Sequence, residues 1–559
     1  MTIALPRPDA TTAPGSLDER LYDLVEGRFR RIVHDNPTTA TFLGIHTEDH
    51  RLADGSRDAL LDELARERAH LAAVEALDPA EMSPSARFER DLELHNLRLS
   101  IFGTEEIRTW ERRSRALDDL GDALFLVFAR DFAPLAERLD SLAGRLEAVP
   151  TFLARHRTRA TVPQVRLWQR LENAAAAELP SLVGDIVAAG EAALRDTDRR
   201  RLARAAETAN RAIAEHAAWL DATLEHGADD WALGSERLDE LVHLRALDGL
   251  DTDAILAIGR EQLEAHRAAR VAAAREIDPT VDERTVVERV KAEHPATFAA
   301  ALEAYRDAML RARAHVIEHD LATVPEDERI EVIPTPAYLR HLIPFAAYFE
   351  SPKFDRDPSG IYIVTPSVDD DPKAMREHNF SSISNTSIHE AYPGHHLQMA
   401  VASRHPSLTR LLTDAPEFVE GWAMYSEQLM REHGFDADAR FRLAMHTDAI
   451  WRACRIILDV RLQRGELGVD QAIDFLVEHT SFERPNARVE IHRYTYTPTY
   501  QLSYLLGKVL ILQLREQERR RLGDRFNLQA FHDSLLDNGS IPISFHRRLL
   551  REAAAGRAA

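Results

Sequence analysis

Three histidines and one glutamate lie within eight consecutive residues and carry the richest chemistry of the chain. The run is His389-Glu390-Ala391-Tyr392-Pro393-Gly394-His395-His396. A histidine next to a glutamate, with another histidine shortly after, is typical of zinc hydrolases. In these enzymes the histidines bind the metal and the glutamate is the general base for the attacking water. We therefore predict that His389 binds zinc and that Glu390 is the general base.

The second histidine of the predicted zinc site lacks the usual helical spacing. Pro393 occupies the position four after His389, and proline cannot bind a metal. On a regular helix the sixth residue on lies about 240° round the axis, and the seventh lies about 10.5 Å along it. Two zinc-bound nitrogens are only about 3.3 Å apart. A kink or bulge at Pro393-Gly394 must restore the geometry. We favour His395 as the second ligand, with His396 as the alternative.

A third ligand is expected from the acidic segment that follows. Glu420 and Glu427 are seven residues apart, so they share one face of a helix predicted to begin near Pro416. Glu420 lies 31 residues after His389, which suits a zinc helix, a turn and a second helix. We predict that Glu420 is the third zinc ligand. Glu427 is predicted to orient a metal-binding histidine by accepting its other N–H.

A second polar cluster, rich in tyrosine, lies nearer to the C-terminus. Tyr500 and Tyr504 are four residues apart and are predicted to share a helix face. Hydrolysis at zinc produces an oxyanion, which a phenol or imidazole donor stabilises. We predict Tyr500 and Tyr504 as these donors, with His492 as a third candidate, and Arg493 as a clamp for a substrate carboxylate. The alternative for each tyrosine is packing against the core with its hydroxyl hydrogen-bonded.

These motifs resemble those of a known protein family. His-Glu-x-x-Pro-Gly-His-His-Leu-Gln at 389–398, followed by Glu-Gly-Trp-Ala-x-Tyr-x-Glu at 420–427, is similar to the pattern of the bacterial DUF885 family. The resemblance runs from about Leu17 to the C-terminus and is most specific between Tyr348 and Gly507. It implies a mainly helical, gluzincin-like metallopeptidase with two histidines and one glutamate on zinc. The glutamate spacing also resembles that of carboxypeptidase Taq-type enzymes.

The elements that must position these residues are predicted to be mainly helical. Helical periodicity recurs over 57–77, 83–101, 117–129, 134–147, 164–190, 196–226, 251–276 and 296–319. Two β-branched runs, Ile330–Ile333 and Ile361–Val364, predict short strands. Their sheet could pair an edge with an extended substrate, or simply cover the core. We expect a large helical body with a small β-sheet beside the zinc helix and a central cleft.

The predicted chemistry is confined to the second part of the chain. We expect a disordered tail at 1–16, rich in proline, threonine and alanine, and a helical scaffold at 17–320. All the candidate motifs fall in a catalytic metal-binding half at 321–559. Both parts are expected to form one continuous helical body.

Composition restricts the partners and the location. The 559 residues are 45% hydrophobic and carry a net charge of −22, so the surface repels nucleic acid and anionic membranes. The single cysteine, Cys454, excludes an intramolecular disulfide and is predicted to be buried and inert. The N-terminus has no sustained apolar run, and no stretch of 18 apolar residues occurs. We therefore expect a cytoplasmic protein with no membrane partner.

The function expected from the sequence is zinc-dependent hydrolysis of a peptide or peptide-like amide bond, with Glu390 as the base. One alternative is a metal-dependent enzyme of another class that acts on a small metabolite. The other is a catalytically inactive metal-binding protein. The intact Glu390 argues against the inactive protein, because binding alone needs no general base.

Overall fold

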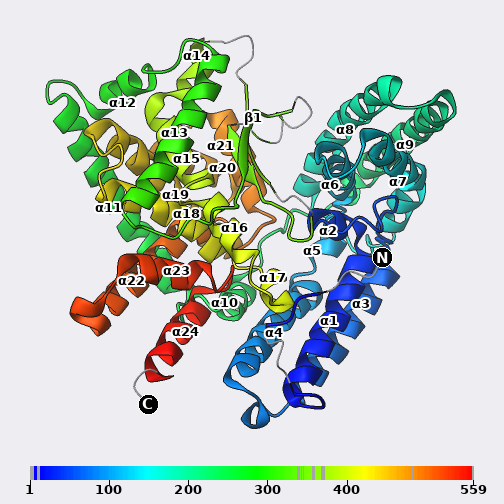
Figure 1. Cartoon of the computed structure of the whole chain (residues 1–559). Coiled ribbons are helices and arrows are strands. Elements are labelled where there is room, and N and C mark those ends of the chain that lie inside the picture. Colours follow the sequence, from blue (N-terminus) through cyan, green and yellow to red (C-terminus); the bar gives the residue numbers. More distant parts are fainter. Residues whose placement is uncertain are drawn as a thin grey trace. The chain divides into compact units, whose positions relative to one another are not determined.

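The structure is a computed structural model that describes residues 5–8, 13–336, 340, 343, 345–355, 359–366, 372–480 and 482–556. Over these residues the chain is mainly α-helical with one small sheet, which confirms the predicted fold class (Figure 1). The chain divides into two compact units. The first comprises Met1–Trp231, Pro352–Pro358 and Ser407–Thr409, and the second comprises Ala232–Ser351, Ser359–Pro406 and Arg410–Ala559. This division follows Trp231, whereas the sequence places the scaffold boundary at residue 320.

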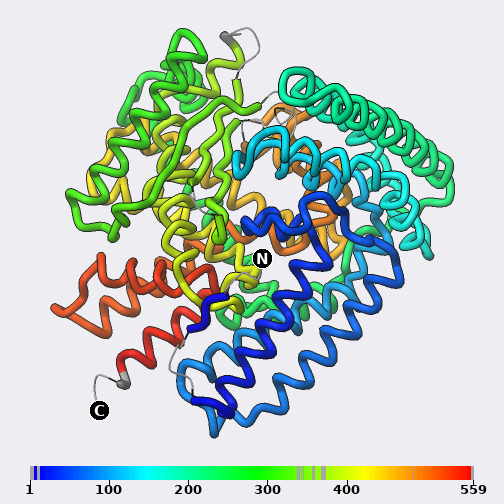
Figure 2. The backbone as a smooth tube through the Cα atoms, turned by 45° about the vertical axis from the view of Figure 1, so that its right-hand side comes forward, coloured from blue at the N-terminus to red at the C-terminus, as the bar shows by residue number. Residues whose placement is uncertain are grey.

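The described part of the first unit is built from helices. Ser56 and Ser83 each cap a helix by accepting a hydrogen bond from a backbone N–H of its first turn. Figure 2 shows the long helices α7, α8 and α9 running side by side, in agreement with their mutual packing. The helices are α1 (Leu17–Asp35), α2 (Pro37–Phe42), α3 (Arg57–Glu75), α4 (Pro84–Phe102), α5 (Thr109–Arg112), α6 (Ala116–Ala129), α7 (Leu135–Arg157), α8 (Arg166–Ala193) and α9 (Asp196–Thr223).

The second unit holds the remaining helices and the sheet. Its helices are α10 (Ser235–Leu244), α11 (Thr252–Ile277), α12 (Glu283–Lys291), α13 (Phe298–Glu318), α14 (Pro372–Met375), α15 (Phe380–Glu390), α16 (His395–Ala402), α18 (Pro416–Glu432), α19 (Ala439–Gln463), α20 (Val469–His479), α21 (Arg484–Tyr494), α22 (Ser503–Leu522), α23 (Leu528–Leu536) and α24 (Ile543–Gly556). The short helix α17 (Leu408–Leu411) lies where the sequence passes from one unit to the other. Among the described residues, no helix is both long and apolar enough to cross a membrane.

The predicted helical ranges agree closely with the observed helices. The largest difference is in α7, which continues through Pro150 to Arg157 instead of ending near residue 147. Val149 and Leu153 are buried with the rest of the apolar face of α7, so packing sustains the helix past the proline. Cys454 is buried in α19, as predicted, and burial raises the pKa of its thiol to about 12.

The N-terminal segment is described only in part. Residues 1–4 and 9–12 of the predicted tail lie outside the described residues. In the described part, Arg7 forms ion pairs with Asp23 at 2.6 Å and with Glu26 at 3.0 Å, both on α1.

The sheet contains three strands in the order β1-β3-β2. The strands are β1 (Ile330–Pro334), β2 (Ala346–Phe349) and β3 (Gly360–Val364). β1 runs parallel to β3, and β2 runs antiparallel to β3 with Tyr348 opposite Tyr362. The sequence predicts β1 and β3 but not β2. β2 contacts α15, the helix bearing His389.

Two helix pairs build the core around the site. α11 packs along α19, and α18 packs along α22. The approach of α18 to α22 is close because Gly421 faces Gly507: a Cβ on Gly421 would lie 2.5 Å from the carbonyl carbon of Gly507. A Cβ on Gly507 would overlap the carbonyl oxygen of Glu417. The helix that carries Glu420 and Glu427 is therefore held by direct backbone contact.

Candidate metal centre

The histidine motif spans two separate helices. α15 ends at Glu390 and α16 begins at His395. The helix is therefore completely interrupted at the place where the sequence predicts a kink or bulge. A Cβ on Gly394 would overlap the carbonyl oxygen of His389, and only glycine fits this turn. The indole N–H of Trp422 donates to the carbonyl of Pro393 at 2.7 Å and ties the turn to α18.

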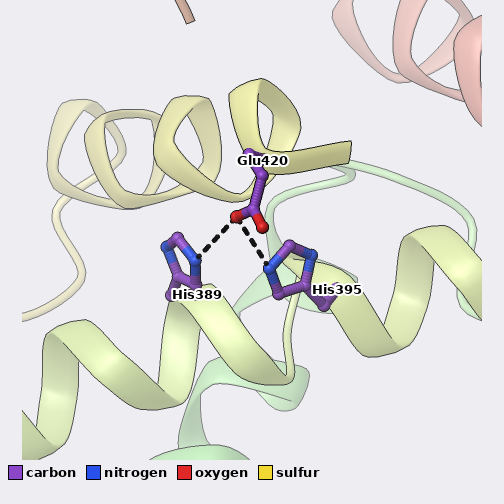
Figure 3. A group of neighbouring side chains, drawn as sticks. All are labelled: His389, His395 and Glu420. Carbon is purple, nitrogen blue, oxygen red and sulfur yellow. Dashed lines mark ion pairs between the residues drawn. The ribbon is translucent and has the colours of Figure 1, made fainter. Parts of the chain in front are cut away.

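The turn brings the three predicted ligands together. His389, His395 and Glu420 each offer one ligand atom, and these atoms lie within 4.8 Å of one another. Glu420 Oε2 lies 3.7 Å from His389 Nε2 and 3.4 Å from His395 Nε2 (Figure 3). All three side chains are largely buried, with 10–12% of each exposed. Among the described residues, this is the one group of three or more such side chains close enough to share an ion.

His396 points to a different set of partners. Its Nε2 lies 2.7 Å from Glu328 Oε2 and its Nδ1 lies 3.0 Å from the Tyr348 hydroxyl. Consecutive helical residues point about 100° apart. His395 and His396 therefore face different surroundings, and the geometry favours His395 as the ligand.

The three side chains fit a zinc ion. Tetrahedral zinc with bonds of about 2.0–2.1 Å requires ligand atoms about 3.3 Å apart, close to the separations from Glu420 to the two imidazoles. Two imidazoles and a carboxylate are also a ligand set of catalytic zinc sites. A zinc ion held by these three side chains would keep a position for a water or a substrate.

The charges at the site also favour a cation. Burial disfavours a charged His389, but the carboxylates of Glu420 and Glu427 outweigh it and raise the pKa of His389 to about 10. Despite its burial, Glu420 has a pKa well below the usual range because the two neighbouring histidines stabilise its charged form. The same carboxylates would stabilise a metal ion between the rings, which requires neutral imidazoles.

Glu427 fixes the orientation of His389. Its Oε1 lies 2.8 Å from His389 Nδ1, so the Nδ1–H is engaged and Nε2 faces Glu420. The Asn385 side chain donates to Glu427 Oε2 at 3.0 Å and to Asp448 Oδ2 at 2.9 Å. This arrangement matches the predicted role of Glu427, since a carboxylate on the second ring nitrogen sets the tautomer of a metal-binding histidine.

Glu390 lies at the end of α15, next to the ligands. Desolvation by its surroundings raises the pKa of its carboxyl, although His389 and His395 oppose this shift. The backbone N–H of Tyr348 on β2 donates to the Glu390 carboxylate. A carboxylate with a raised pKa is a stronger base and is better suited to accept and return a proton.

Tyr500 and Tyr504 reach the cluster from the segment around the start of α22. The Tyr500 hydroxyl donates to Glu420 Oε1 at 3.1 Å and lies 3.3 Å from the Tyr504 hydroxyl. Only Tyr504 is helical, because α22 begins at Ser503 and Tyr500 lies in the preceding turn. The predicted shared helix face is therefore wrong, although the two hydroxyls still meet.

Arg493 and His492 both lie on α21. Arg493 pairs with Glu490 at 2.9 Å, and Glu490 also pairs with Arg455 at 3.1 Å. The Arg455 guanidinium in turn lies 4.6 Å from the centre of the Tyr504 ring. Arg493 is thus linked to the cluster through Glu490, Arg455 and Tyr504. The charged neighbours that influence His492 are Arg488 and Asp470, not the residues of the cluster.

Comparison with known proteins identifies the family. The family model described as a bacterial protein of unknown function (DUF885) matches residues 37–550. The chain belongs to the DUF885 family. Among curated proteins, none matches the sequence of this DUF885 member.

Two solved structures share the fold of this DUF885 protein. A putative lipoprotein of unknown function from Shewanella oneidensis is 21% identical with a TM-score of 0.79, over 95% of the present chain and 99% of its own. A putative lipoprotein from Colwellia psychrerythraea is 19% identical with a TM-score of 0.84, over 97% of the present chain and 100% of its own. At these identities the likeness shows a common fold.

The descriptions of these two structures contradict the predicted cytoplasmic location. Both are called putative lipoproteins, and the prediction that this DUF885 protein is cytoplasmic is wrong. The prediction rested on the lack of an apolar run near Met1. The lack of one targeting signal does not define a location.

Sequence reasoning missed several residues around the site of this DUF885 protein. Tyr348, Glu328, Asn385 and Asp448 all contact the motif or its neighbours. Glu328 lies 68 residues before His396 in the chain. A single carboxylate that far from the motif carries no spacing signal. For Tyr348 the one available signal was its place at the start of the most specific part of the family resemblance.

Proposed function

We propose that this DUF885 protein is a zinc-dependent hydrolase that cleaves a peptide or peptide-like amide bond. The observation that carries the proposal is the convergence of His389, His395 and Glu420 directly beside Glu390. Two imidazoles and a carboxylate at these separations suit zinc. A neighbouring glutamate with a raised pKa provides the base that hydrolysis needs.

The residues of the site have distinct roles in this reaction. Zinc held by the three ligands would supply a water whose pKa is lowered to about 7. Glu390 accepts a proton from the attacking water at its carboxylate and then donates it to the nitrogen of the leaving amine. Glu427 keeps His389 in the tautomer whose Nε2 is free to bind the metal.

Tyr500 is the proposed donor to the oxyanion. Burial and the nearby Glu420 carboxylate raise its pKa above the ordinary value, so the phenol keeps its proton at neutral pH. The hydroxyl lies 3.1 Å from Glu420 Oε1, beside the metal ligands. A protonated phenol at this place can donate to the carbonyl oxygen as it gains negative charge. Tyr504 supports Tyr500 through the contact between their hydroxyls.

The edge strand β2 favours an extended peptide as the substrate. β2 stands at one end of the strand order, and it contacts the zinc-binding helix α15. An extended peptide can bind next to an edge strand by strand addition. Arg493, half-exposed on α21, remains the candidate for binding a substrate carboxylate.

Metal analysis combined with a peptide screen tests this proposal. We expect about one zinc per chain, and hydrolysis of some member of a panel of short peptides with free and blocked termini. A chelator should abolish hydrolysis, and added zinc should restore it. Protein without metal, and no gain on adding zinc, would contradict the metal site. Bound zinc with turnover only of a small non-amide metabolite would contradict the peptidase assignment while keeping the metal site.

A further inference from the structure

His396 occupies a buried polar cluster that the proposed chemistry does not use. The side chain is 1% exposed. Glu328 accepts hydrogen bonds from Tyr392 Oη at 2.6 Å and from Arg313 Nε at 2.9 Å, and its Oε2 lies 2.7 Å from His396 Nε2. Tyr392 and Arg313 thus fix the Glu328 carboxylate, and the carboxylate in turn holds Nε2 of the His396 ring in place. The ring is locked, and its other nitrogen points at Tyr348.

Tyr348 is the residue through which this cluster reaches the sheet. Its hydroxyl lies 3.0 Å from His396 Nδ1. The contact needs a glycine at position 360 on β3, because a Cβ there would lie 2.5 Å from the Tyr348 hydroxyl and 2.9 Å from His396 Nδ1. The sheet thus leaves a space that the Tyr348 ring fills against His396.

The main chain of the same residue contacts the predicted general base. The Tyr348 backbone N–H donates to the Glu390 carboxylate. Tyr348 thus has two anchors on the histidine motif: its hydroxyl on His396 and its N–H on Glu390. Because β2 lies at the sheet edge, β3 supports it on one side only. All residues of β2 are only half-buried, so apolar burial holds the strand weakly and the polar anchor matters more.

We propose that His396 is a positioning residue that holds β2 through the Tyr348 hydroxyl, so that the Tyr348 N–H fixes the Glu390 carboxylate beside the metal ligands. The catalytic part of this inference rests on the proposed function, because it assigns Glu390 as the base. The structural part, the holding of β2 by His396, stands on the contacts alone. The adjacent histidines then have different roles. His395 would bind the metal, and His396 positions the strand that orients the base.

Amide hydrogen exchange tests the structural part without any need for activity. Tyr348→Phe removes only the hydroxyl that contacts His396, and His396→Gln removes the imidazole from the other side. Both variants should speed exchange of the β2 amides at 346–349 while exchange in β1 stays unchanged. Tyr425→Phe is the matched control, since it removes another buried tyrosine–histidine hydrogen bond, to His532 at 2.7 Å. Unchanged β2 exchange in both test variants would overturn the inference.

Kinetics in two backgrounds test the catalytic part. Tyr348→Phe should lower kcat about 10–100-fold, as expected for the loss of a group that orients a catalytic residue, while zinc content stays at the wild-type level. In a Glu390→Gln background the same change should have almost no further effect, because the group that it positions is already gone. An equal loss in both backgrounds would overturn the link to Glu390. If the wild-type protein hydrolyses nothing but β2 exchange responds as expected, the proposed function fails and the role of His396 in holding β2 stands.

Discussion

Two neighbouring histidines of the motif have unlike partners. His395 Nε2 lies 3.4 Å from Glu420, whereas His396 is enclosed by Glu328 and Tyr348. Among the described residues, the buried Nδ1 of His395 has no hydrogen-bond partner, and its Nε2 lies on the side of the proposed metal. A change at either histidine therefore affects a different part of the site, although the two residues are adjacent in the chain.

Exchanging each histidine in turn separates the two roles. We expect His395→Ala to abolish zinc binding, because it removes one of three protein ligands. His396→Gln should keep about one zinc per chain, because the side chain faces Glu328 and Tyr348. Metal content measured by mass spectrometry of dialysed protein distinguishes the two. Loss of zinc in His396→Gln with retention in His395→Ala would reverse the ligand assignment.

The general base can be tested by an isosteric change. Glu390→Gln keeps the shape of the side chain but removes its ability to accept a proton. We expect the variant to bind zinc as tightly as the wild type and to lose about 10²–10⁴ in kcat, the usual contribution of acid–base catalysis. Steady-state rates on a substrate from the peptide screen provide the measurement. Activity within a few-fold of wild type would show that another group accepts the proton.

At the scale of elements, the site depends on how closely helices and turns approach. α15 and α16 are separated by a turn that only Gly394 permits. α18, which carries Glu420, is held against α22 by the contact of Gly421 with Gly507. Close backbone approach fixes the height of Glu420 above the two histidines better than flexible side chains could.

A methyl group at the α18–α22 contact should disturb the fold. In Gly507→Ala the added Cβ would overlap the carbonyl oxygen of Glu417, a backbone atom that cannot yield. We expect a loss of about 2 kcal/mol or more in the free energy of unfolding, at the upper end of overpacking costs, and weaker zinc binding. The control is Gly184→Ala in α8, where the added Cβ would have no atom of another described segment within 4 Å.

In Gly184→Ala only helix propensity should change, and we expect the free energy of unfolding to rise by up to about 1 kcal/mol. Urea unfolding of both variants checks the pair. Equal stability of Gly507→Ala and the wild type would mean that α18 and α22 can separate without cost.

At the scale of the whole molecule, the first unit contains a segment from far along the chain. Pro352–Pro358 belongs to it, and Asp355 of this segment contacts His46. His46 Nε2 lies 3.0 Å from Asp355, its Nδ1 lies 2.9 Å from Asp49, and its ring stacks on Phe132. Burial disfavours the charged ring, but the two carboxylates outweigh it and raise the pKa of His46 to about 9.

This histidine predicts how the stability of the first unit depends on pH. The folded pKa of about 9 lies above the ordinary value of 6.5, so protonated His46 stabilises the fold fully below about pH 6.5. The contribution is lost progressively as the pH rises to about 9. His46→Gln should therefore be less stable than wild type at pH 6, and the difference should shrink by pH 9.5. Thermal unfolding across this range, with exposed His34→Gln as control, provides the test. A difference independent of pH would exclude the charged pair.

The sequence by itself determined most of the long helices between residues 57 and 319, two of the strands and the residues that meet at the candidate site. Helical periodicity depends on residues three and four apart, and the His389, His395 and Glu420 assignment depends on chemistry and spacing along a short stretch. Such signals are local, so a single sequence contains them. The interruption of the helix at Pro393-Gly394 is likewise predicted from neighbouring residues. Only the structure shows that it divides the motif between two separate helices.

Tertiary structure alone decided the strand β2, the contacts of Tyr348 and Glu328, the turn conformation of Tyr500 and the division after Trp231. The β2 sequence, Ala-Ala-Tyr-Phe, has no alternation of apolar and polar residues, and all of its positions are half-buried. The strand forms because β3 offers it hydrogen bonds. Glu328 meets His396 across 68 residues of chain. Hydrogen bonds and packing of this kind are made between distant segments, and their free energy depends on partners that neighbouring residues do not specify.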